Sequence, residues 1–84
     1  MNTMIIKTSV LGYECTKHVV ETNCSVDDLK KIDSKYGMQY RHESTSIHQL
    51  EDGARKEGFI FNTLHSEKTN EWKGGDYFAN YGNY

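Results

Sequence analysis

The segment SVDDLKKIDSKYG, residues 25–37, decides the fold because it carries a complete set of helix signals. Ser25 can cap a helix, and Asp28 three residues later completes a capping box. Apolar residues then recur at helical spacing and form one stripe: Val26, Leu29, Ile32 and Tyr36. Gly37 is the residue type that commonly ends a helix in the left-handed conformation. The segment therefore predicts a helix from about Val26 to Tyr36.

Strand patterns precede this helix. Residues 4–11 are mostly β-branched and apolar, with Met4, Ile6 and Val10 on one face. Residues 13–22 predict a second strand, close enough in sequence to form a hairpin with the first around Leu11-Gly12. The chain is therefore expected to begin as an antiparallel pair.

Two further strands are predicted after the helix. Residues 38–43 alternate in the manner of a strand, and residues 59–64 place Phe59 and Phe61 on one face and Ile60 on the other. Strands this close together in the chain favour an antiparallel sheet.

The stretch from Ser44 to Gly58 has two interpretations. Ser46 and Gln49 form a second capping-box pattern before a possible buried stripe: Ile47, Leu50 and Ala54. Against that, Asp52-Gly53 is a strong hairpin signal. We favour a short helix but leave the hairpin open. The expected fold is a single α+β domain over residues 1–84, a small antiparallel sheet in ββαβ(α)β order with one main helix packed on one face.

The length and composition of the chain limit which classes of protein it can belong to. The chain has 84 residues, 36 % of them hydrophobic, so its core is small and self-association as a homodimer is expected. A formal net charge of −2 argues against strong non-specific binding to nucleic acid over the whole surface. There is no apolar run of membrane-spanning length and no signal-peptide pattern, and the two cysteines are expected as reduced thiols. These features favour a cytoplasmic protein without a membrane segment.

Two groups of residues suggest a metal site or a catalytic site. Cys15, His18 and Cys24 suggest zinc, but the cysteines stand alone at a spacing unlike the paired ligands of structural zinc sites, so buried thiols and no metal or cofactor are expected. Small ribonucleases need only an acid, a base and a cation. Six residues between positions 41 and 65 supply these groups: His42, His48, His65, Arg41, Glu43 and Glu51. Nothing in the sequence shows that they converge, so no catalytic residue is predicted.

Two other groups are candidates for binding. Cations that would contact RNA phosphates if they share a face are Lys30, Lys31, Lys35, Arg41, Arg55 and Lys56. A solvated helix face is the alternative, and Asp28 and Asp33 dilute the charge. The Gly-, Asn- and aromatic-rich C-terminal segment, residues 74–84, and nearby Trp72 supply aromatic side chains suited to a partner surface: Trp72, Tyr77, Phe78, Tyr81 and Tyr84. Their alternative role is to extend the core.

A family resemblance rests on three segments. Residues 4–14, MIIKTSVLGYE, residues 77–84, YFANYGNY, and residues 40–44, YRHES, resemble small counter-defence accessory proteins of T-even-like coliphages, in particular the TifA-like toxin inhibitors. The resemblance implies a non-enzymatic inhibitor that binds a host defence protein, such as a toxin endoribonuclease, its RNA, or both. An anti-CRISPR-type inhibitor that binds protein only is the first alternative, and a small ribonuclease is the second.

Overall fold

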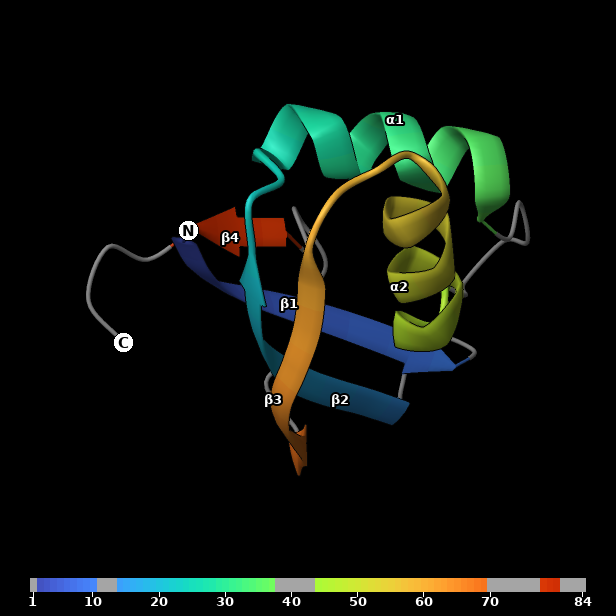
Figure 1. The fold of residues 1–84 in the computed structure, drawn as a ribbon. Coiled ribbons are helices and arrows are strands. Elements are labelled where there is room, and N and C mark those ends of the chain that lie inside the picture. The colour runs from blue at the N-terminus through green and yellow to red at the C-terminus, as the bar shows by residue number, and fades with distance from the viewer. Residues whose placement is uncertain (1, 11–13, 38–43, 70–77, 81–84) are drawn as a thin grey trace.

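The computed structural model describes residues 2–10, 14–37, 44–69 and 78–80. These residues form an α+β fold, which confirms the predicted class (Figure 1). The elements in chain order are β1 (Asn2–Val10), β2 (Glu14–Thr22), α1 (Val26–Tyr36), α2 (Ile47–Lys56), β3 (Phe61–Thr69) and β4 (Phe78–Asn80).

The strands form an antiparallel sheet in the order β3-β2-β1-β4. β1 and β2 pair along their whole length, from Asn2 opposite Thr22 to Val10 opposite Glu14, as the hairpin prediction required. β3 begins later and runs further than the predicted strand at 59–64, because residues 59 and 60 lead into it rather than pair. The short β4 was not predicted. The predicted strand at 38–43 lies outside the described residues.

α1 has the predicted bounds and both hydrogen bonds of its capping box. The Asp28 N–H donates to Ser25 Oγ at 3.0 Å, and the Ser25 N–H donates to Asp28 Oδ2 at 3.0 Å. The prediction for Gly37 is wrong. Its φ of −83° and ψ of 172° are extended, and its N–H donates to the Asp33 carbonyl at 2.8 Å, so α1 ends without a left-handed residue.

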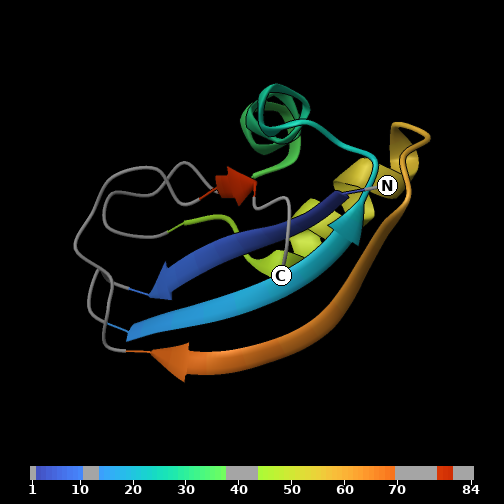
Figure 2. The ribbon, with the colours of Figure 1, turned by 90° about the vertical axis from the view of Figure 1, so that its left-hand side faces the viewer.

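Residues 47–56 form α2, so the helical interpretation holds and the hairpin at Asp52-Gly53 is wrong. Gly53 is buried where α2 crosses α1. A Cβ there would lie 2.8 Å from both Ile32 Cγ2 and Tyr36 Cδ2, a distance that side chains do not tolerate. The glycine therefore serves close helix packing rather than a turn. As a result two helices cover the sheet, not the one main helix that we expected (Figure 2).

The core lies between the helices and one face of the sheet. It contains Met4 and Ile6 from β1, Val20 from β2 and Phe61 from β3. The helices and the turn before α1 complete it with Cys24, Leu29, Ile32, Ile47, Leu50 and Ala54. No helix in the described ranges is long and apolar enough to cross a bilayer.

Candidate functional site

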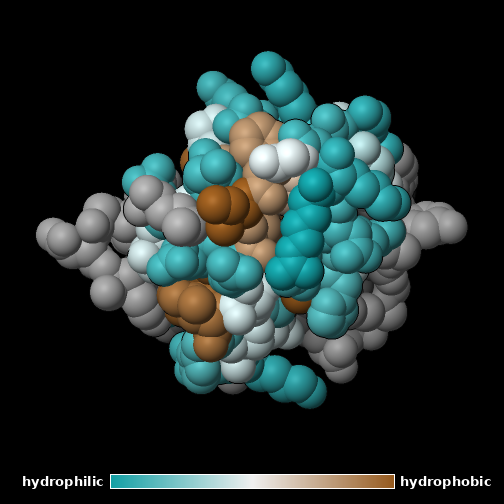
Figure 3. All heavy atoms as spheres, viewed as in Figure 1, coloured by the Kyte–Doolittle hydropathy of each residue, from teal (hydrophilic) through white to brown (hydrophobic). Residues whose placement is uncertain are grey.

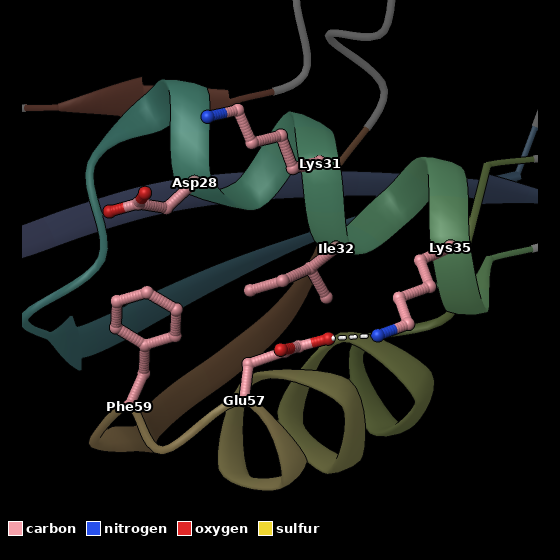
Figure 4. Close-up of a pocket in the computed structure, with 6 residues that line it drawn as sticks. All are labelled: Asp28, Lys31, Ile32, Lys35, Glu57 and Phe59. Carbon is pink, nitrogen blue, oxygen red and sulfur yellow. Dashed lines mark hydrogen bonds and ion pairs between the residues drawn. The ribbon is translucent and has the colours of Figure 1, made fainter.

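A groove of about 260 Å³ lies between α1 and the segment that joins α2 to β3. Six residues line it: Asp28, Lys31, Ile32, Lys35, Glu57 and Phe59. The first four recur at positions i, i+3, i+4 and i+7 of α1 and so share one face of that helix. Figure 4 shows the side chains of Ile32 and Phe59 pointing into the space between the two segments. The groove therefore has apolar walls and a charged rim, which we call the α1 groove.

One end of the α1 groove is closed by an ion pair. Lys35 Nζ lies 2.7 Å from Glu57 Oε1 (Figure 4). The Tyr36 hydroxyl donates to the same carboxylate oxygen at 3.0 Å. The hydrogen bond from Lys35, followed by that from Tyr36, holds the pKa of Glu57 below its usual range. The same bond raises the pKa of Lys35. Both residues are therefore charged at neutral pH, and their charges largely cancel.

The other end of the α1 groove carries a second acid. Asp28 accepts the Ser25 N–H, and this hydrogen bond, with smaller help from Lys31, lowers the pKa of the Asp28 carboxyl. The Lys31 ammonium points away from the apolar floor (Figure 4). This end of the α1 groove therefore has Asp28 at its rim and Lys31 beside it on α1.

Among the predicted RNA-contacting cations that the structure describes, two are paired with carboxylates. Lys30 and Lys31 are exposed on α1 and form no salt bridge to another described residue. Arg55 Nη2 lies 2.9 Å from Glu51 Oε1 and donates to the Phe61 carbonyl, so this side chain links α2 to β3.

The other three predicted RNA-contacting cations are Lys35, Lys56 and Arg41. Lys35 is paired as above, and Lys56 Nζ lies 5.6 Å from the centre of the Tyr36 ring, within cation–π range. Arg41 lies outside the described residues. Two of the five cations that the structure describes are therefore matched by glutamates.

The aromatic partner residues fall largely outside the described part of the chain. Phe78 begins β4, whereas Trp72, Tyr77, Tyr81 and Tyr84 are not in the described residues. The structure places another aromatic side chain, Phe59, at the α1 groove, although Phe59 was predicted to lie in a strand. No local signal pairs Phe59 and Glu57 with α1, because the contact joins segments more than 20 residues apart.

The zinc hypothesis does not match the geometry. Cys15 and Cys24 are buried free thiols, and burial raises the pKa of each. Cys15 and His18 lie three residues apart on β2, so their side chains point to opposite faces of the sheet. Among residues 2–10, 14–37, 44–69 and 78–80, no three His, Cys, Asp or Glu side chains are grouped to hold a metal ion.

His18 is buried, whereas His48 and His65 are exposed. Its Nδ1 lies 2.7 Å from Ser66 Oγ and its Nε2 lies 2.9 Å from Thr8 Oγ1, so both ring nitrogens have hydroxyl partners. Burial, and then the nearby His48, lowers the pKa of His18. The sequence carries no signal for this contact, because the three residues come from different strands.

The residues of the ribonuclease hypothesis are not brought together where they are described. His48 is exposed on α2, and Glu51 on the same helix pairs with Arg55. His65 is exposed on β3 opposite Val19, on the face of the sheet away from the helices. His42, Arg41 and Glu43 lie outside the described residues.

Comparison of the chain with protein-family models, with curated protein sequences and with solved structures finds no match. The site is therefore interpreted from its own chemistry. An apolar groove with a balanced charged rim suits an amphipathic segment of another protein.

Proposed function

We propose that the chain is a non-catalytic inhibitor that binds a host defence protein, such as a toxin endoribonuclease, through the α1 groove. The observation that carries the proposal is the pairing of an apolar wall, Ile32 and Phe59, with a rim in which Lys35 is neutralised by Glu57. Burying an apolar side chain between such walls provides affinity, and rim charges select the partner. The resemblance to phage counter-defence proteins supports the biological role.

A protein partner fits this surface better than RNA does. Phosphate binding requires cations whose charge is available, and each phosphate contact adds to the dependence of affinity on salt. Lys35 and Arg55 are already matched by carboxylates at 2.7 and 2.9 Å. RNA remains a second candidate through Lys30 and Lys31, because both are exposed and neighbouring on α1.

The experiment is recovery of a tagged chain from bacterial cells, with and without nuclease digestion. We expect a host protein that stays bound after digestion and whose activity falls in proportion to the added chain, as stoichiometric inhibition requires. Recovery of RNA alone, or loss of every protein after digestion, would favour the RNA hypothesis. RNA cleavage by the purified chain would favour the ribonuclease alternative.

A further inference from the structure

Strand β3 lies at one edge of the described sheet and is largely exposed. It ends the strand order β3-β2-β1-β4, so one of its edges has no neighbour in the described sheet. Its nine residues span roughly 30 Å. Most of its side chains are exposed: Asn62, Leu64, His65, Ser66, Glu67 and Lys68. A long, exposed edge strand is a template for pairing with another strand.

Apolar exposure also concentrates at this edge. Among the described residues, the large hydrophobic side chains that are exposed are Ile60, at 46 %, and Leu64, at 58 %. One precedes β3 directly and the other lies within it. The register shift between Val19 and Val20 leaves Leu64 without a partner on β2. Figure 3 shows that apolar surface on the face seen in Figure 1 is limited to patches bordered by hydrophilic side chains.

The sequence of β3 favours one register of antiparallel pairing with a second copy of the same strand. In a symmetric antiparallel pair of two β3 strands, the two-fold axis passes beside one residue, and residues equally far from it on either side face each other. An axis at Ser66 places His65 of each copy opposite Glu67 of the other. It also places Leu64 opposite Lys68, whose aliphatic stem can cover it.

The neighbouring registers are less favourable. An axis at Glu67 sets two glutamates directly opposite each other, where like charges repel. An axis at His65 sets two histidines opposite each other, with no carboxylate facing either ring. In the single chain His65 Nε2 already lies 3.7 Å from Glu67 Oε2, so the two side chains are on one face of the sheet. Two copies would interleave these side chains as two His–Glu pairs.

We infer that β3 is a self-association surface, and that two copies of this chain join edge to edge with the axis at Ser66. The result is one continuous antiparallel sheet across the dimer. The α1 groove lies on the helical layer and stays accessible in each copy. This interface is independent of the function proposed for that groove.

Sedimentation equilibrium at about 100 µM protein tests the interface. The wild-type chain forms a dimer. Glu67→Lys removes the carboxylate that faces His65 of the other copy and weakens association at least about tenfold. The double change His65→Glu with Glu67→Lys places a glutamate opposite a lysine at both positions and recovers dimer. Asp52→Lys makes the same charge change on exposed α2 and leaves the dimer intact. A monomeric wild type, or Glu67→Lys that associates unchanged, overturns the inference.

A cross-linking pair locates the axis. Ser66→Cys places two thiols opposite each other across the proposed axis, and we expect a disulfide-linked dimer on mild oxidation. Asn62→Cys is an equally exposed position on the same strand, but its two copies would be roughly 26 Å apart, so it stays unlinked. Circular dichroism confirms that each variant is folded. Equal cross-linking at both positions contradicts this register.

Discussion

At the scale of single residues, His18 shows how the sheet accommodates a buried polar ring. Thr8 and Ser66 lie on the strands to either side and meet its two nitrogens at 2.9 and 2.7 Å. A buried imidazole with both nitrogens bonded to hydroxyls costs little as long as it is neutral. The position is therefore structural while uncharged and destabilising once it is protonated.

We predict that the chain loses stability as the solution becomes acidic. The pKa of His18 is lower in the fold than its ordinary value of 6.5, so the unfolded chain binds the proton more readily. Stability contributed by neutral His18 is full above pH 6.5 and is lost as pH falls from there toward the folded-state pKa. Thermal unfolding between pH 7.5 and 5, at constant salt, measures this.

Two variants separate His18 from other groups. His48→Gln removes the smaller cause of the lowered pKa and is expected to reduce the loss in acid, whereas Asp52→Asn, an exposed change on the same helix, is expected to leave that loss unchanged. A wild-type unfolding temperature that stays constant through this pH range would contradict the assignment.

At the scale of helices and strands, local signals predicted what depends on local chemistry. Both capping boxes were readable because each joins residues three apart, and both helices begin where those boxes place them. The failures have a different origin. The sequence pattern indicated a turn at Gly53, but this glycine is needed for the close packing of α2 on α1. The pattern also indicated a left-handed helix end at Gly37, which is extended in the structure.

Strand boundaries and the site depended on contacts that the sequence does not display. β3 extends to Thr69 because β2 is there to pair with it, and this polar stretch has no apolar alternation of its own. The α1 groove needed the α2–β3 connection to return beside α1. Lysines could be placed on an exposed helix face from periodicity, but the glutamates that neutralise two of the cations could not.

We predict that Gly53→Ala destabilises the chain although alanine is the better helix former. Propensity favours alanine by about 1 kcal/mol, but overpacking against Ile32 and Tyr36 costs about 1–3 kcal/mol. The net expectation is a loss of about 1 kcal/mol in the free energy of unfolding, measured by urea titration. Asp52→Ala is the matched control, an exposed neighbour on the same helix with an expected change within about 0.5 kcal/mol. A more stable Gly53→Ala would refute the close crossing.

At the scale of the whole molecule, the proposed binding groove and the two edges of the described sheet lie on different parts of the surface. The helical layer carries the α1 groove, β3 forms one edge of the described sheet, and β4 forms the other by pairing with Met4, Ile5 and Ile6 of β1. A domain this small has little stability in reserve, so each edge of the sheet matters.

We predict that deletion after Gly75 lowers stability without preventing self-association. The deletion removes β4 and its pairing with β1, for an expected loss of about 1–3 kcal/mol in the free energy of unfolding. β3 lies at the opposite edge, so the deleted chain is expected to dimerise as the full chain does wherever it is folded. Denaturant titration and sedimentation measure the two effects, and a folded deletion variant that is only monomeric would place the interface elsewhere.

The central claim is that the chain binds a protein partner through the α1 groove, and two neighbouring lysines test it most directly. Lys30 and Lys31 are both exposed on α1, and each follows an aspartate by three residues, but Lys31 lines the groove and Lys30 does not. Charge reversal therefore costs the helix about the same at either position. Calorimetric titration of the recovered partner into each variant is the measurement.

We predict that Lys31→Glu weakens partner affinity about tenfold or more, whereas Lys30→Glu leaves it within about twofold. Equal losses in the two variants would indicate contacts made by charge alone, as with phosphates. Unchanged affinity for Lys31→Glu, in a variant that circular dichroism shows to be folded, would contradict the claim that the α1 groove is the binding site.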